Sequence, residues 1–157
     1  MRDRDSIATS GGCTWDWWDG VEDEMDRLNH PHEDEVAITH LDVLVERAER
    51  NGISARDLTA PEGLKLGRHT LPWVGALKSS GIRNRPGEGS RAYRLYFAET
   101  TLSHRSLLAA KLSWKCTSWA DDKTKKHQTH EVKDAVGITE RYCREQGCDC
   151  RRIVTSP

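Results

Sequence analysis

Apolar residues recur at helical spacing near the start of the chain. Intervals of three and four residues separate them, which places them on one face of a helix: Trp15, Trp18, Val21, Met25 and Leu28. The alternation of residues 15–17 also fits a short strand, so both readings of that stretch stay open. Pro31 ends the element.

Three further helices are predicted. The first carries an apolar stripe of Ala37, Leu41, Leu44, Val45 and Ala48 and ends at Asn51-Gly52, as a C-terminal cap would. Ser54 and Asp57 resemble a capping box and predict a short helix before Pro61. The third begins at Thr129 as N-cap and ends at Gly147, with an apolar face of Val132, Ala135, Val136, Thr139, Tyr142 and Cys143.

Strands are predicted between these helices. Residues 71–78 form a strand or strand entry, and residues 83–91 form an Arg-rich turn. Residues 91–99 alternate, with Tyr93, Leu95 and Phe97 opposite Arg94 and Tyr96. Residues 107–116 also alternate, with Leu108, Ala110, Leu112 and Trp114 opposite Lys111, Ser113 and Lys115. The short connection between these strands predicts an antiparallel hairpin.

The pattern predicts an α+β fold with N-terminal helices, a small antiparallel sheet and a C-terminal helix. With 157 residues, we expect a polar tail over 1–13 and a single domain over 14–157. No apolar run is long enough to cross a bilayer and no secretion signal is visible, so a soluble, cytoplasmic protein is expected. Most tryptophans fit the core, while Trp17 and Trp119 could also belong to a partner surface.

Charge divides the chain into two parts. Residues 1–60 hold 6 Lys and Arg against 15 Asp and Glu, and residues 61–157 hold 18 against 10. Lys and Arg neutralise backbone phosphates, and exposed Tyr and His can stack on unpaired bases. The basic part therefore favours nucleic-acid binding, although each residue could equally belong to a solvated surface. The candidate binding residues are Arg83, Arg85, Tyr96, Lys111, Lys115, Lys125, Lys126 and Arg141.

Five cysteines and no secretion signal predict reduced thiols. No cofactor is expected. Zinc is the less favoured alternative, because the spacing is not that of a common ribbon or finger; its candidate ligands are His127, His130, Cys143, Cys148 and Cys150.

Three segments carry a resemblance to a known family: residues 74–83, 91–99 and 125–135, the last with Lys125-Lys126 before an acidic helix entry. Together with the order of elements, they resemble the RelE/ParE/HigB superfamily of toxin–antitoxin toxins over roughly residues 15–146. His130 stands where that family often has Pro. The Arg-rich turn is longer than in compact members, and the acidic N-terminal extension and the C-terminal cysteines are departures.

The resemblance implies a ribosome-dependent endoribonuclease that cleaves mRNA by attack of a ribose 2′-OH on its own phosphate. Such a reaction needs a base, an acid and cations. The candidate catalytic residues are Lys78 with Arg91 or Arg94 for charge, His127 or His130 as base or acid, and Tyr142 for stacking or proton transfer.

The resemblance also implies a cognate antitoxin, mRNA and the ribosome as partners, with no membrane; the oligomeric state stays open. Three alternatives remain: a non-catalytic nucleic-acid or protein binding module on the same fold, a gyrase-inhibiting ParE-like toxin, and a zinc-stabilised interaction protein.

Overall fold

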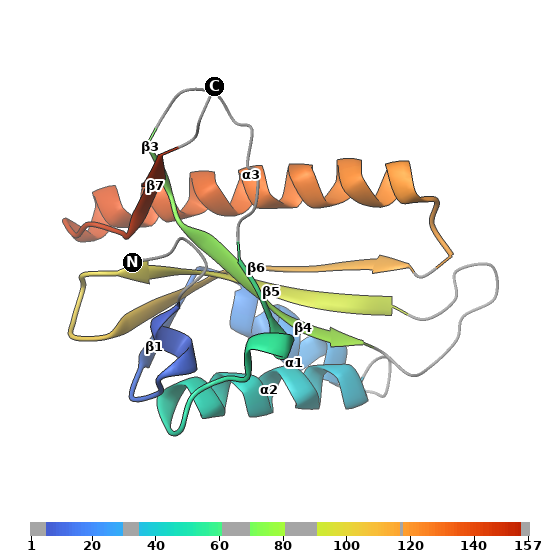
Figure 1. Cartoon of the computed structure of the whole chain (residues 1–157), viewed down its shortest axis with the longest axis horizontal. Helices are drawn as coiled ribbons and strands as arrows, with labels where there is room; N and C mark the ends of the chain where they lie inside the picture. Colours follow the sequence, from blue (N-terminus) through green and yellow to red (C-terminus); the bar gives the residue numbers. More distant parts are fainter. Residues whose placement is uncertain (1–5, 30–34, 61–69, 81–90, 117, 155–157) are drawn as a thin grey trace.

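The computed structural model describes residues 6–29, 35–60, 70–80, 91–116 and 118–154. A mixed five-stranded sheet in the order β1-β6-β5-β4-β2 separates helices α1 and α2 from the long helix α3 (Figure 1). The described elements are, in chain order, the 3-10 helix η1 (Ile7–Thr9), β1 (Thr14–Trp17), α1 (Val21–Asn29), α2 (Glu35–Glu49), the 3-10 helix η2 (Ala55–Asp57), β2 (Leu58–Thr59), β3 (Thr70–Pro72), β4 (Val74–Ser80), β5 (Arg91–Thr100), β6 (Ser106–Cys116), α3 (Asp121–Gln146) and β7 (Arg152–Val154). The predicted α+β class is confirmed.

The strand reading of residues 15–17 is the correct one. Strand β1 pairs in parallel with the start of β6, so the sheet is mixed rather than purely antiparallel. The indole Nε1 of Trp15 donates to the carbonyl of Val45 in α2 at 3.0 Å. A helix running from Trp15 was therefore a wrong prediction, because backbone pairing with β6 holds this stretch extended and α1 begins only at Val21.

The predicted hairpin of β5 and β6 is confirmed, with a β-bulge that the alternation did not reveal. Tyr96 faces Lys111, whereas Phe97 faces Ala109, so β6 contains one extra residue at this point. A one-residue shift moves later side chains to the other face of a sheet. Leu108 therefore lies opposite Ala98, on the face of Tyr96 and Lys111, and not with Ala110, Leu112 and Trp114 as predicted.

The predicted strand over residues 71–78 is divided into two. Strand β3 pairs with β7 in a separate two-stranded sheet, and β4 joins the main sheet beside β5. Trp73 lies at the division and its backbone N–H donates to the carbonyl of Arg151. Its side chain is fully buried and contacts the ring of Phe97 edge-on.

Helix α2 matches its prediction closely. All five residues of the predicted stripe are buried, and Gly52 adopts a φ of 99° beyond the end of the helix. The expected capping box is absent, because the Ser54 side chain makes no cap hydrogen bond and only the short helix η2 follows.

The N-cap of helix α3 lies nine residues earlier than predicted. The helix starts at Asp121 with Ala120 as N-cap, so Thr129 lies inside the helix and its hydroxyl donates to the carbonyl of Lys125. The C-terminal end is as predicted, with Gly147 in the left-handed conformation at a φ of 64°. The Lys-rich segment before Thr129 is consequently helical.

The chain segments before β1 and after α3 meet at one end of β5. Glu99 accepts from Arg151 at 2.9 Å and from the backbone N–H of Ile7 at 3.3 Å. Ala8 and Cys13 are buried, and Arg105 donates to the carbonyls of Ile7 and Gly11. The prediction of a polar tail therefore fails for residues 6–13; residues 1–5 lie outside the described residues.

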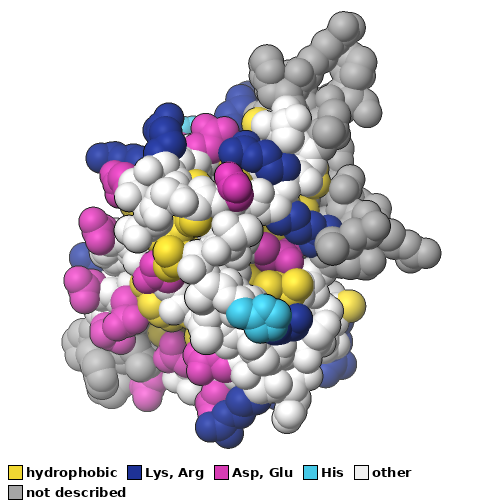
Figure 2. All heavy atoms as spheres, turned by 90° about the vertical axis from the view of Figure 1, so that its left-hand side faces the viewer, with side chains coloured by type: hydrophobic (Ala, Val, Ile, Leu, Met, Phe, Trp, Pro, Cys, Tyr) yellow, Lys and Arg dark blue, Asp and Glu magenta, His cyan; other side chains and the backbone are white. Residues whose placement is uncertain are grey.

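The helices on the two faces of the sheet differ in charge. The acidic helix α1 and helix α2 cover one face of the sheet, and the Lys-rich start of α3 covers the other (Figure 1). Figure 2 views the end of the molecule away from the first turns of α3, where acidic and basic side chains occur together. No helix in the described part of the chain has the length and apolar character needed to span a membrane.

We expect Gly52→Ala to destabilise the protein more than Gly20→Ala does. Both glycines have positive φ, which costs a residue with a side chain about 1–2 kcal/mol. A Cβ at Gly20 meets nothing within 4 Å, whereas one at Gly52 would lie 2.1 Å from the carbonyl oxygen of Thr9. Urea unfolding should show an additional loss of at least about 2 kcal/mol for Gly52→Ala. Equal losses would show that the close approach of residues 9 and 52 is not maintained.

Candidate nucleic-acid interface

A row of polar side chains crosses the face of the sheet that α3 covers. Lys78 of β4 is directly opposite Arg94 of β5, and Arg94 is opposite Ser113 of β6. Residues paired across neighbouring strands project to the same face. The register therefore places the two predicted cations beside each other, and Lys115 follows on the same face of β6.

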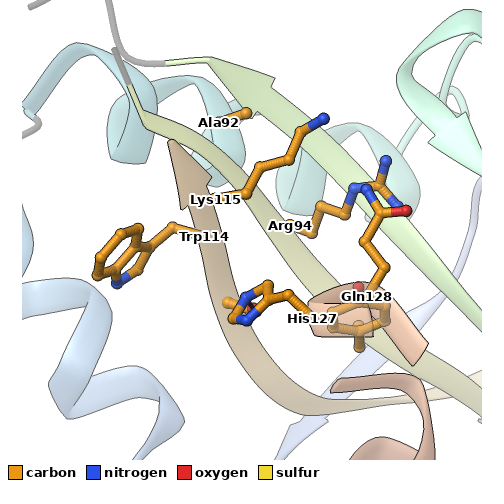
Figure 3. Close-up of a pocket in the computed structure, with 8 residues that line it drawn as sticks. Ala92, Arg94, Trp114, Lys115, His127 and Gln128 are labelled. Carbon is orange, nitrogen blue, oxygen red and sulfur yellow. Dashed lines mark hydrogen bonds between the residues drawn. The ribbon is translucent and has the colours of Figure 1, made fainter. Parts of the chain in front are cut away.

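Helix α3 adds His127 to this row. Nε2 of His127 lies 3.3 Å from the hydroxyl oxygen of Ser113, and its imidazole helps to line a small hollow beneath the first turns of α3. Figure 3 shows Arg94, Lys115 and Gln128 extending to one side of this hollow and Trp114 to the other. The hollow has a volume of about 10 Å³, which is room for one water molecule. A phosphate group would therefore lie over the hollow.

The Lys111 ammonium forms an ion cluster with two carboxylates of α3. The ammonium lies 2.8 Å from Oε2 of Glu131 and 2.6 Å from Oδ2 of Asp134. Burial alone would lower the pKa of Lys111, but the hydrogen bonds and charges of the two carboxylates outweigh it and raise that pKa. The hydrogen bond from Lys111 lowers the pKa of Asp134. Lys111 therefore docks α3 on the sheet, and its predicted role in phosphate binding is not supported by its surroundings.

Tyr96 is also unsuited to its predicted role. Its side chain is almost fully buried beneath α3, so it offers no ring face for a base. Burial raises the pKa of its hydroxyl, and the neighbouring Arg94 guanidinium acts in the opposite direction. Tyr96 instead packs between the sheet and α3, next to the Arg94 guanidinium.

Aromatic rings continue the interface beyond the end of β6. The guanidinium carbon of Arg91 lies 4.0 Å from the ring centre of Trp114. Trp114 contacts Trp119 at 5.9 Å between ring centres, and Trp119 contacts His127 at 5.0 Å. Arg91, a predicted catalytic residue, is thus engaged with an aromatic ring, and the residues that line the hollow do not include it.

The other predicted site residues lie away from this hollow. Lys125, Lys126 and His130 are on the outer side of α3, where the His130 side chain is 71% exposed and lies 3.5 Å from Asp134. Arg141 is exposed further along α3 and pairs with Glu145. Arg83 and Arg85 lie outside the described residues.

Tyr142 is excluded from the candidate catalytic site. The Tyr142 side chain is buried, and the residue lies about 22 Å from His127 along the axis of α3, at a rise of about 1.5 Å per residue. Its hydroxyl donates to Oδ2 of Asp16 at 2.5 Å. Burial and this hydrogen bond raise its pKa. Tyr142 therefore anchors the C-terminal half of α3 to β1.

The zinc candidates do not form one site. His127 and His130 are in the first half of α3, and Cys143 is about 24 Å from His127 along the helix axis. Among the described residues, the group of potential metal ligands that come within reach of one ion is His130, Glu131 and Asp134. The ammonium of Lys111 already contacts both of those carboxylates. All five cysteines are free thiols, as expected.

Several residues of the interface were not predicted. Gln128 lines the hollow, and Glu131 and Asp134 form the ion cluster. The start of α3 was placed at Thr129, which hid the helical relation of residues 127, 131 and 134. With the correct start, intervals of three and four residues would have placed these side chains on one face.

Comparison of the chain with family models, with curated proteins and with solved structures finds no match.

We expect Lys111→Met to destabilise the protein by about 2–3 kcal/mol, because it leaves the Glu131 carboxylate, 11% exposed, without its cation. Adding Glu131→Gln should recover part of this loss, since the double variant contains no unpaired carboxylate at that position. Urea unfolding measures both effects. Lys126→Met, at an exposed position of the same helix, should change stability by less than about 0.5 kcal/mol. Additive losses in the double variant would contradict the pairing.

The cluster should also be detectable by its response to acid. Because the pKa of folded Asp134 is lowered, the unfolded chain binds more protons in acid, and the stabilisation by Asp134 is lost as pH falls. The difference in free energy of unfolding between wild type and Asp134→Asn should narrow as the pH falls below 3.8, the ordinary pKa of the group. In a Lys111→Met background this narrowing should largely disappear. A persistent narrowing there would show that Lys111 is not its cause.

Proposed function

We propose that the chain is a toxin of the RelE/ParE/HigB type that binds mRNA on the ribosome and cleaves it, and that a partner antitoxin neutralises it. The observation that carries the proposal is the cross-strand row of Lys78, Arg94 and Ser113 with His127 set against its end. The order of the elements adds support, because two helices, three neighbouring antiparallel strands and a closing helix follow one another as the resemblance implies.

Each residue of the row has a chemical task in this proposal. Lys78, Arg94 and Lys115 stabilise the charge that grows on the phosphate oxygens. His127 takes the proton from the ribose 2′-OH, since imidazole is the side chain suited to proton transfer near neutral pH. The 2′ oxygen then forms a bond to phosphorus, and the bond from phosphorus to the 5′ oxygen breaks. The departing oxygen receives its proton from solvent.

A second candidate is RNA binding without cleavage at the same surface. The small hollow favours it, because about 10 Å³ admits a water molecule but not a nucleotide. In that case Lys78, Arg94 and Lys115 hold backbone phosphates, and His127 packs against Ser113 and the ring of Trp119.

The two candidates are distinguished by cleavage in a translating extract. We expect wild-type protein to cut a reporter mRNA and Arg94→Ala to lose cleavage and much of its RNA binding. His127→Ala should slow cleavage by about 10² to 10⁴-fold while it keeps most RNA binding, because it removes a proton carrier and not a phosphate contact.

Arg47→Ala is the matched control, because Arg47 is an exposed cation of α2 on the other side of the sheet. Binding without cleavage by the wild type would favour the second candidate. Unchanged binding and cleavage in Arg94→Ala would exclude both candidates at this surface.

A further inference from the structure

Trp119 differs from the other five tryptophans in its surroundings. Trp15, Trp17, Trp18, Trp73 and Trp114 all belong to the hydrophobic core or pack against it. Trp119 is partly exposed in the short connection between β6 and α3, and its ring contacts are with Trp114 and His127. Packing in the core therefore does not explain why a tryptophan occupies this position.

Cations surround the aromatic pair. Nζ of Lys123, an exposed residue of the first turn of α3, lies 4.4 Å from the ring centre of Trp119. Arg91 lies over the ring of Trp114, and His127 contacts Trp119 at an interplanar angle of 76°. Surfaces that bind single-stranded nucleic acid combine these two features, a positively charged groove and aromatic rings on which bases stack.

We propose that Trp119 is a stacking site for an unpaired RNA base, next to the phosphate held by Arg94. This inference rests on the proposed function and adds the form of the substrate to it, namely single-stranded RNA. The base would take the place of the Lys123 side chain on the indole ring. The Lys123 ammonium would then be available to a phosphate of the same strand.

The charges argue for RNA over a peptide partner at this site. An arginine-rich peptide could also stack on an indole ring. However, Arg91 and Lys123 already lie against the two rings and would repel it. A paired base would not fit either, because its faces are covered by the neighbouring bases of the duplex.

Binding of three probes by Trp119→Leu tests the inference. The probes are a labelled single-stranded RNA, a blunt duplex of the same sequence, and inorganic polyphosphate. We expect Trp119→Leu to weaken binding of the single strand about tenfold and to leave the other two unchanged, because stacking is lost while the cations remain. Trp119→Phe should retain most of the affinity, and Trp17→Leu on β1 is the matched control.

The outcomes separate this inference from the function on which it rests. Unchanged single-strand binding in Trp119→Leu, or an equal loss with all three probes, would overturn the stacking site. If Arg94→Ala binds RNA and polyphosphate as tightly as wild type, the proposed RNA interface itself fails. Circular dichroism and thermal unfolding of each variant identify a loss that comes from unfolding.

Discussion

The pairing of the Lys111 ammonium with the carboxylates of Glu131 and Asp134 determines where α3 lies on the sheet. The contact is made from the middle of β6 to the middle of α3, where Lys111 is partly buried and Glu131 is buried. A charge in such a place is costly unless it is paired and hydrogen-bonded. Because one ammonium satisfies two carboxylates one helical turn apart, it defines both the position and the rotation of the helix, and His127 is held against Ser113 as a result.

The cations on this face of the sheet, all from the basic part of the chain (residues 61–157), form two groups. Lys111 is neutralised within the protein, whereas Lys78, Arg94 and Lys115 share the same face and lie around or beside the hollow. The proposed RNA interface therefore uses the cations near the first turns of α3. Arg91 and Lys123 extend it through the indole rings of Trp114 and Trp119.

The opposite end of α3 is held by different contacts. Tyr142 is hydrogen-bonded to Asp16 of β1, and the segment after Gly147 follows the end of β5, where Arg151 pairs with Glu99. The chain segments before β1 and after α3 are thereby attached to the same strand. A helix anchored at its middle and at its C-terminal end presents its first turns, with His127 and Gln128, in a defined position.

Local sequence patterns were sufficient for much of the fold. The stripe of α2, Gly147 beyond α3 and the pairing of β5 with β6 follow from periodicity and turn chemistry that act over a few residues. The placement of Arg94 on the polar face of its strand follows in the same way, and so does the candidate role of His127. The proposal of an RNA-cleaving toxin comes from this sequence reasoning and from the resemblance.

Tertiary structure decided the features that depend on residues far apart in the chain. Pairing with β6 made residues 14–17 a strand, and the bulge in β6 moved Leu108 to the other face. The packing of α3 on the sheet pairs Lys111 with carboxylates and places Tyr142 far from His127. The same packing leaves Trp119 outside the core. Sequence patterns report local preference, whereas the partner of a charge or a ring is determined by which distant elements pack together.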